Sequence, residues 1–176
     1  MEKARIHIYC GDGKGKTTAA IGLSVRSCGR GWPVVLSQFL KGSTSGELNV
    51  LRTLPDYHYI PAPTTTCKFI FQMTEQEKAD YGRQVRRHFA DTVEAVKKYH
   101  AKLLVMDEVL DAVAMGMLSD EALAEFLRNR PEDLEVVMTG RAPTPCTDPL
   151  ADYITRMQKV RHPFDKGLNA RLGVEF

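Results

Sequence analysis

Cysteine is scarce in this sequence, and no cysteine stands in a metal-binding arrangement. The chain of 176 residues has four cysteines, namely Cys10, Cys28, Cys67 and Cys146. No two of them are spaced as C-x-x-C, and none has the spacing to histidine that zinc sites use. These absences argue against a structural zinc site and predict reduced, mostly buried thiols, as expected of a cytoplasmic protein.

Long apolar runs and an excess of one charge are also missing. No apolar run approaches the roughly 20 residues that cross a bilayer, and the N-terminal stretch MEKARIHIYC is too polar and too short for a signal peptide. Lys and Arg total 24 against 22 Asp and Glu, a formal net charge of +2. Such a balance gives no global field for nucleic acid or membrane, so we expect neither partner and look for local anion sites.

Repeats, linkers and low-complexity segments are absent from the sequence as well. A length of 176 residues suits one domain with a full core and is short for two. Hydrophobic residues make up 43% of the chain, which is typical of an ordered globular protein. We therefore expect a single domain over residues 1–176.

What the sequence does contain is a regular alternation of apolar strands and helices. Strands are predicted over residues 5–10, 34–39, 57–61, 103–106 and 135–138. Helices are predicted over residues 17–28, 48–54 and 150–157, with one more capped by Thr74 and Glu77 and another capped by Ser119. This alternation predicts an α/β fold with a mostly parallel central sheet flanked by helices.

Polar loops follow four of the predicted strands. These loops are residues 11–16, 41–47, 107–108 and 139–141. Ligands of parallel sheets bind at the carboxyl ends of the strands. We therefore expect the four loops to form one site.

The most informative stretch is CGDGKGKTTAA, residues 10–20. The phosphate-loop pattern is G-x-x-x-x-G-K-[ST], and Gly15, Lys16 and Thr17 match its second half. Cys10 stands where the first glycine should be. The loop is therefore either one residue tighter than usual or lacks this glycine.

The remaining residues of this loop still suit a phosphate group. Gly11 and Gly13 let backbone N–H groups turn toward an anion, and the following helix directs its positive end there. Lys16 adds a point charge, and the Thr17 hydroxyl can ligate Mg²⁺. This context favours a nucleoside triphosphate with Mg²⁺ over a glycine-rich turn without a ligand. The role of Lys14 is open, because its side chain either contacts phosphate or is simply solvated.

Two other strand ends carry charged residues. Asp107 and Glu108 follow an apolar strand, as acidic residues that hold Mg²⁺ directly or through water do in phosphate-loop proteins. The alternative is a surface pair that caps a helix. Arg141 follows another strand and either makes a bidentate contact with phosphate or forms a structural ion pair.

A series of motifs runs through nearly the whole chain in one order. They are GDGKGKTTAA, QFLKG followed by GE, VMDE, TGR and VRHPFDKGLNARLGVEF. Together they resemble the ATP:corrinoid adenosyltransferases, which work on cobalamin and its cobyric precursors. The altered phosphate loop belongs to this resemblance, because that family also lacks the first glycine.

The resemblance implies a three-layer phosphate-loop NTPase fold (RecA-like) and an unusual reaction. ATP would lie in the reversed sense along the loop, and cobalt(I) of a corrinoid, either cobalamin or cobyrinic acid a,c-diamide, would attack its C5′ carbon. A cobalt–carbon bond would form and tripolyphosphate would leave, in adenosylcobalamin biosynthesis or salvage. The resemblance further implies Mg²⁺, a flavoprotein reductant and a homodimer.

The resemblance also implies roles for individual residues. The triphosphate would be held by Gly11, Asp12, Gly13, Lys14, Gly15, Lys16, Thr17 and Thr18, with Arg26 and Arg141 as further contacts to ATP. Thr17 and Glu108 would hold Mg²⁺ with support from Asp107, and Lys16 and Glu108 would be the catalytic residues. Lys41 and Glu47 would line the corrinoid side of the site.

The apolar stretch CKFIFQM gains a possible purpose from the resemblance. In the family, an aromatic pair in this loop crowds the lower face of the corrin and displaces the lower axial ligand of cobalt(II), which eases its reduction. Phe69 and Phe71 match that spacing, although better-known members carry Trp at the second position. The alternative is that both are core residues, as most phenylalanines are.

The N-terminal residues bear on what covers the site, and the C-terminal motif contains a histidine with two possible roles. Longer members have an N-terminal segment that covers the site, whereas only nine residues precede Cys10 here. We expect another element, or a partner subunit, to exclude water. His162 in the C-terminal motif serves either catalysis or a structural hydrogen bond.

Two other functions compete with adenosyl transfer. A small-molecule kinase or another phosphate-loop NTPase would release ADP and would need a polar acceptor pocket. A non-catalytic nucleotide-binding regulator would bind ATP without turnover. Neither explains the missing first glycine.

Overall fold

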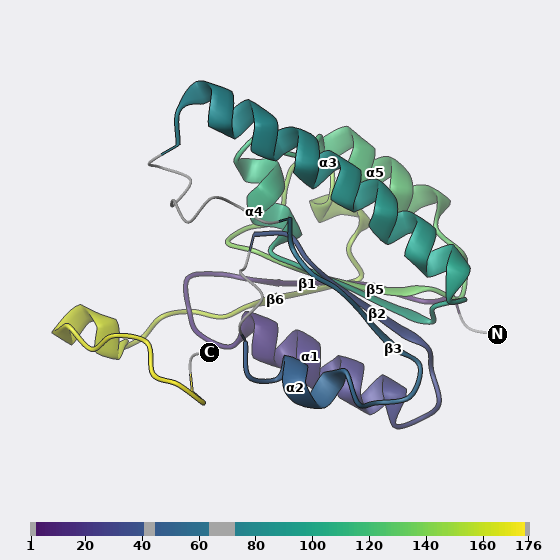
Figure 1. Cartoon of the computed structure of the whole chain (residues 1–176), viewed down its shortest axis with the longest axis horizontal. Helices are drawn as coiled ribbons and strands as arrows, with labels where there is room; N and C mark the ends of the chain where they lie inside the picture. Colours follow the sequence, from purple (N-terminus) through teal and green to yellow (C-terminus); the bar gives the residue numbers. More distant parts are fainter. Residues whose placement is uncertain (1–2, 41–44, 64–72, 175–176) are drawn as a thin grey trace.

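A six-stranded parallel sheet forms the centre of the molecule (Figure 1). The computed structural model describes residues 3–40, 45–63 and 73–174. The strand order across the sheet is β3-β2-β4-β5-β1-β6. The strands are β1 Ile6–Cys10, β2 Val34–Gln38, β3 Tyr57–Ile60, β4 Leu103–Asp107, β5 Glu135–Thr139 and β6 Tyr153–Arg156.

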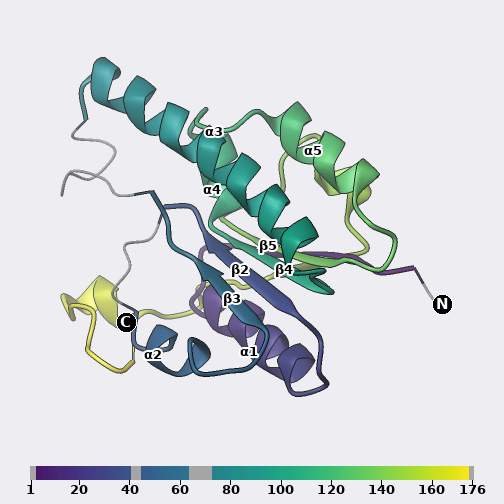
Figure 2. The same ribbon diagram turned by 45° about the vertical axis from the view of Figure 1, so that its right-hand side comes forward.

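Helices cover both faces of this sheet. On one face lie α1 Lys16–Cys28 and α2 Leu48–Leu51, and on the other lie α3 Glu75–Lys98, α4 Val109–Ala114 and α5 Asp120–Asn129 (Figures 1 and 2). Strands β2 and β4 are buried at every position, because apolar layers cover them on both sides. The predicted α/β class and three-layer phosphate-loop NTPase arrangement are confirmed.

The predicted starts of two helices are confirmed in detail. Thr74 and Glu77 form a reciprocal capping box at the start of α3. The Ser119 hydroxyl accepts a hydrogen bond from the Ala122 N–H at the start of α5. No helix in the described part of the chain is both long enough and apolar enough to span a bilayer.

The helix predicted over residues 150–157 is wrong. A short 3₁₀ turn, Asp148–Leu150, is followed by β6, which pairs in parallel with β1 at the edge of the sheet. Every residue of β6 is exposed, so the strand lacks the alternation of buried apolar and exposed polar side chains that usually predicts a strand. Its stability comes from the open edge of β1, from the β-forming residues Tyr153, Ile154 and Thr155, and from stacking of Tyr153 on His7.

Candidate active site

The phosphate loop connects the end of β1 to the start of α1. Cys10 is fully buried and still belongs to β1, where it pairs in register with Arg156 of β6. The loop begins at Gly11, which has φ +110°, and the Gly11 N–H donates to the Arg141 carbonyl. Cys10, which stands where the first glycine of the pattern would be, therefore belongs to the strand, and the loop begins one residue later.

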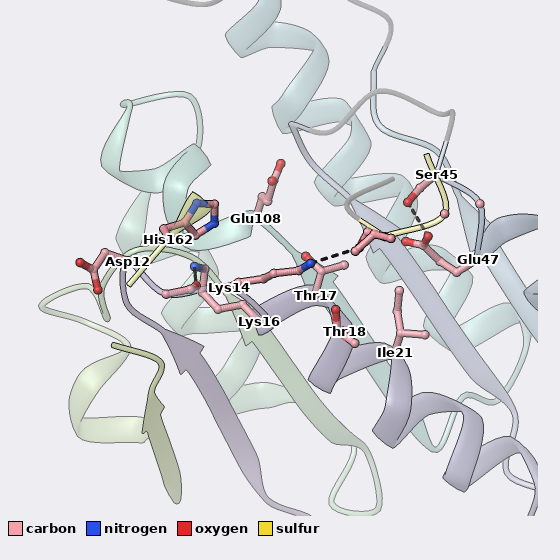
Figure 3. Close-up of a pocket in the computed structure, with 15 residues that line it drawn as sticks. Asp12, Lys14, Lys16, Thr17, Thr18, Ile21, Ser45, Glu47, Glu108 and His162 are labelled. Atoms are coloured by element: carbon pink, nitrogen blue, oxygen red, sulfur yellow. Dashed lines mark hydrogen bonds between the residues drawn. The ribbon is translucent and has the colours of Figure 1, made fainter. Parts of the chain in front are cut away.

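One open cavity of about 590 Å³ lies over this loop and the first turn of α1. Figure 3 shows His162 and Glu108 toward one end of the cavity and Ser45 and Glu47 toward the other, with Lys16 between them. The lining residues are Asp12, Gly13, Lys14, Gly15, Lys16, Thr17, Thr18, Ile21, Ser45, Gly46, Glu47, Glu108, His162, Gly173 and Val174.

The Lys16 side chain folds over the loop that precedes it. Its Nζ donates to the Gly11 carbonyl at 2.8 Å and to the Gly13 carbonyl at 2.9 Å. These two hydrogen bonds hold the ammonium group above the loop and at the wall of the cavity. A cation in this position adds to the positive N-terminal end of α1, so an anion is favoured there.

The Asp107 carboxylate is the centre of a buried hydrogen-bond network behind the cavity. Its Oδ1 accepts from the Thr17 hydroxyl at 2.9 Å and from the Thr139 hydroxyl at 2.7 Å. Its Oδ2 accepts from the Gln38 amide at 3.3 Å. Asp107 has no exposed surface, which contradicts the alternative that it belongs to a surface pair.

The network around Asp107 joins three strand ends and the first turn of α1. Gln38 is also fully buried, and its Oε1 accepts from the Tyr59 hydroxyl at 2.8 Å. This bond fixes which way the Gln38 amide points, so that its NH₂ group faces Asp107. Because Thr17 donates its only hydroxyl proton to Asp107, its oxygen lone pairs remain for a cation.

Glu108 is held in an unusual backbone conformation beside this network. It is the residue before α4 and has φ +63°, a left-handed value that non-glycine residues rarely adopt. Its N–H donates to the Thr139 hydroxyl at 2.8 Å. This conformation presents Glu108 to the cavity while the neighbouring Asp107 stays buried.

The C-terminal segment, residues 157–174, crosses the outside of the phosphate loop (Figure 1). The Met157 N–H donates to the Cys10 carbonyl at 2.8 Å, and the Gly13 N–H donates to the Met157 carbonyl at 2.7 Å. A Cβ atom on Gly11 would lie 2.3 Å from the Met157 oxygen, and one on Gly13 would lie 2.7 Å from it. The loop therefore needs these glycines for the segment to pack against it.

A model of the family ATP:corrinoid adenosyltransferase BtuR/CobO/CobP matches residues 2–176. The chain belongs to this family. It is 29% identical to the corrinoid adenosyltransferase of Escherichia coli (strain K12), over 99% of this chain and 87% of that protein. It is 31% identical to corrinoid adenosyltransferase CobA of Salmonella typhimurium, with the same two shares covered, and 32% identical to the corrinoid adenosyltransferase of Pseudomonas aeruginosa, over 99% and 85%.

Except for Gly11, the predicted triphosphate contacts over residues 11–18 of this adenosyltransferase line the cavity, and one of them, Asp12, also binds the C-terminal segment. Its carboxylate accepts a hydrogen bond from the Lys159 N–H at 3.0 Å. That bond is the main reason that the pKa of Asp12 lies below its ordinary value. Asp12 therefore holds the C-terminal segment in this structure, and its role toward phosphate stays a prediction.

The two predicted arginines lie away from the cavity. Arg26 is exposed in the last turn of α1, at the opposite end of that helix from the phosphate loop. Arg141 has an exposed side chain, while its backbone N–H donates to Asp111 and its carbonyl accepts from Gly11. In this structure Arg141 supports the base of the loop through its backbone.

The predicted corrinoid side of the site is only partly described. Glu47 precedes α2, accepts a hydrogen bond from the Ser45 hydroxyl and lines the cavity. Lys41, Phe69 and Phe71 lie outside the described residues, so their predicted roles stay predictions.

Sequence reasoning missed several residues that complete the site. Gln38 and Thr139 lie in the quoted motifs QFLKG and TGR but were given no role of their own, although each is a polar residue at the end of an apolar strand, which is the signal that could have found them. Met157 acts through its backbone, and no side-chain pattern could have marked it.

Proposed function

We propose that this protein transfers the 5′-deoxyadenosyl group of ATP to cobalt(I) of a corrinoid and releases tripolyphosphate. The observation that carries the proposal is the GKT phosphate loop lining one cavity in a chain that matches the adenosyltransferase family over residues 2–176. Cobalt(I) supplies an electron pair to C5′ of ATP. The C5′–O bond breaks, and the triphosphate leaves with the bonding electrons, so a cobalt(III)–carbon bond results.

The phosphate loop in this proposal stabilises the leaving group rather than a phosphate under attack. Negative charge grows on the triphosphate as the C5′–O bond breaks. In this proposal Lys16 and the N–H groups at the start of α1 stabilise this charge, which is supported by the hydrogen bonds that fix the Lys16 ammonium group over the loop, since donors fixed in advance lower the barrier most. ATP bound in the reversed sense places C5′ away from the loop, toward the corrinoid.

The residues around Thr17 fit a bound Mg²⁺. Mg²⁺ in nucleotide sites takes one or two protein oxygens and fills its other positions with water and phosphate. The Thr17 hydroxyl oxygen and the Glu108 carboxylate line the cavity, while Asp107 orients Thr17 from behind. When bound, Mg²⁺ would add positive charge at the leaving triphosphate.

Several finer proposals come from the family resemblance. They are a single functional domain over residues 1–176, nucleotide contacts from Arg26 and Arg141, and corrinoid contacts from Lys41, Glu47, Phe69 and Phe71. The resemblance also supports a flavoprotein as the source of electrons, a homodimer, and work in the cytoplasm within adenosylcobalamin biosynthesis or salvage. Which corrinoid is preferred would follow from comparing cobalamin with cobyrinic acid a,c-diamide as substrates.

The test is an anaerobic reaction of the protein with ATP, Mg²⁺ and a chemically reduced cobalt(I) corrinoid. We expect a light-sensitive adenosylcorrinoid and tripolyphosphate in equal amounts. Lys16→Ala should lower turnover by a factor of about 10² to 10³, which is typical when one donor to a developing anion is removed. Release of ADP would indicate a kinase or NTPase, and ATP bound but left intact would indicate a regulator; either result would overturn the proposal.

A further inference from the structure

The C-terminal segment, residues 157–174, forms part of the wall of the nucleotide cavity. His162, Gly173 and Val174 line the cavity together with the phosphate loop. The Lys14 ammonium group donates to the Val174 carbonyl at 3.3 Å, which joins the far end of the segment to the same loop. A ligand that fills this cavity would therefore contact the segment as well as the loop.

The backbone around His162 holds its ring in a defined place. His162 is the residue before a 3₁₀ turn, Pro163–Lys166, and its Nδ1 accepts a hydrogen bond from the Phe164 N–H at 3.1 Å. An ion pair between Lys159 and Asp165, at 3.0 Å, joins the two sides of this turn. The hydrogen bond from the Lys159 N–H to the Asp12 carboxylate anchors this 3₁₀ turn to the phosphate loop.

The hydrogen bond at Nδ1 decides what the ring can offer a ligand. A nitrogen that accepts a hydrogen bond carries no proton, so the proton of the neutral His162 ring is on Nε2. Nε2 is therefore a hydrogen-bond donor. The same cavity is lined by Lys14, Lys16 and the glycines of the phosphate loop, which also offer donors or positive charge.

We propose that His162 is a nucleotide-binding residue that donates its Nε2–H to a phosphate oxygen of ATP. This inference rests on the proposed function, because it requires ATP at the phosphate loop. It gives the C-terminal segment a binding role in addition to covering the loop. The role is specific for the polyphosphate, so it extends to tripolyphosphate without the nucleoside.

The test compares the dissociation constants of ATP and tripolyphosphate for three variants and the unaltered protein, by calorimetric titration with Mg²⁺. His162→Phe keeps a flat ring and removes the donor, and we expect both ligands to bind about tenfold more weakly, as for the loss of one hydrogen bond to a charged group. His162→Gln keeps an amide donor near the position of Nε2 and should restore most of the affinity. Val160→Ala is the matched control, because Val160 lies on the same segment with its side chain 91% exposed.

Each other outcome has a distinct meaning. Equal affinities for His162→Phe and the unaltered protein would overturn the inference while leaving the proposed function intact. A loss for ATP without a loss for tripolyphosphate would place the contact on the nucleoside and would also overturn it, as would failure of His162→Gln to restore binding. If the unaltered protein binds neither ligand, the proposed function itself is wrong.

Discussion

The network around Asp107 and the C-terminal segment both hold the phosphate loop, but they differ in burial and in the kind of contact they make. The network around Asp107 lies inside the sheet, where Asp107, Gln38 and Thr139 have at most 1% of their surface exposed. The C-terminal segment lies outside, and its apolar side chains at Val160 and Leu172 are 91% and 80% exposed. The network contacts the loop through Thr17, whereas the segment contacts it mainly through backbone groups.

The network and the C-terminal segment serve two different tasks within one site. The network sets the orientation of Thr17 and Glu108, so it needs donors and acceptors that stay fixed and exclude water. The segment completes the wall of the cavity and covers the loop, which it can do with few buried contacts. A region held by few buried contacts opens at lower free-energy cost than the core. The C-terminal segment therefore packs against the outside of the phosphate loop through contacts that can open more easily than the network.

The largest effect on stability is expected when the network loses its central acceptor. Asp107→Ala leaves the Thr17 and Thr139 hydroxyls and the Gln38 amide without their partner, two of them in fully buried positions. We expect the free energy of unfolding to fall by about 3 kcal/mol, measured by urea denaturation. Asp107→Asn keeps the shape and one acceptor oxygen, so it should cost less. An unchanged midpoint for Asp107→Ala would show that the network contributes nothing to stability.

A smaller effect is expected when the contact between loop and segment is forced apart. Gly13→Ala places a methyl group 2.7 Å from the Met157 oxygen, so the segment must shift. We expect a loss of about 1–3 kcal/mol in unfolding free energy, weaker ATP binding and faster tryptic cleavage after Lys159. Gly22→Ala is the control, because nothing lies within 4 Å of its added methyl group in α1, and it should stabilise the protein by about 0.5–1 kcal/mol. Similar cleavage rates for the two variants would refute the packing argument.

The smallest effect is expected from the titration of Asp12. The hydrogen bond from the Lys159 N–H lowers the pKa of Asp12 below 3.8 when the segment is docked, so docking favours the charged carboxylate. This contribution is present at neutral pH and is lost as the pH falls through the docked-state pKa. The amide signal of Lys159 in NMR spectra should shift with a midpoint below 3.8, and Asp12→Asn should abolish that shift. A midpoint at or above 3.8 would contradict the hydrogen bond.

Local patterns predicted much of the fold because their causes lie within a few residues. The capping box of Thr74 and Glu77 and the cap at Ser119 each depend on neighbouring residues, and both formed as expected. The prediction for residues 150–157 was wrong because β6 depends on a partner far away in the chain. Its four residues bury no apolar face, so only the open edge of β1 decides their conformation.

The candidate site also contains residues that a local pattern predicts and residues whose partners lie far away in the chain. The glycines, Lys16 and Thr17 follow a pattern that one stretch of the sequence contains, and the structure brings them together with Glu108 at one cavity. The partner of Asp12 is Lys159, which is 147 positions away, and no local pattern predicts that pair. Asp12 was therefore assigned to phosphate, whereas its carboxylate holds the C-terminal segment.

The sequence by itself determined the alternating strands and helices, the phosphate loop and the motifs of the adenosyltransferase family. The tertiary structure decided that Cys10 pairs with Arg156, that Gln38 and Thr139 orient Asp107, and that Met157 crosses the loop where Gly13 leaves room. The physical reason is the strand order. It places β6 beside β1 and β4 between β2 and β5, and therefore determines which groups from distant parts of the chain come into contact.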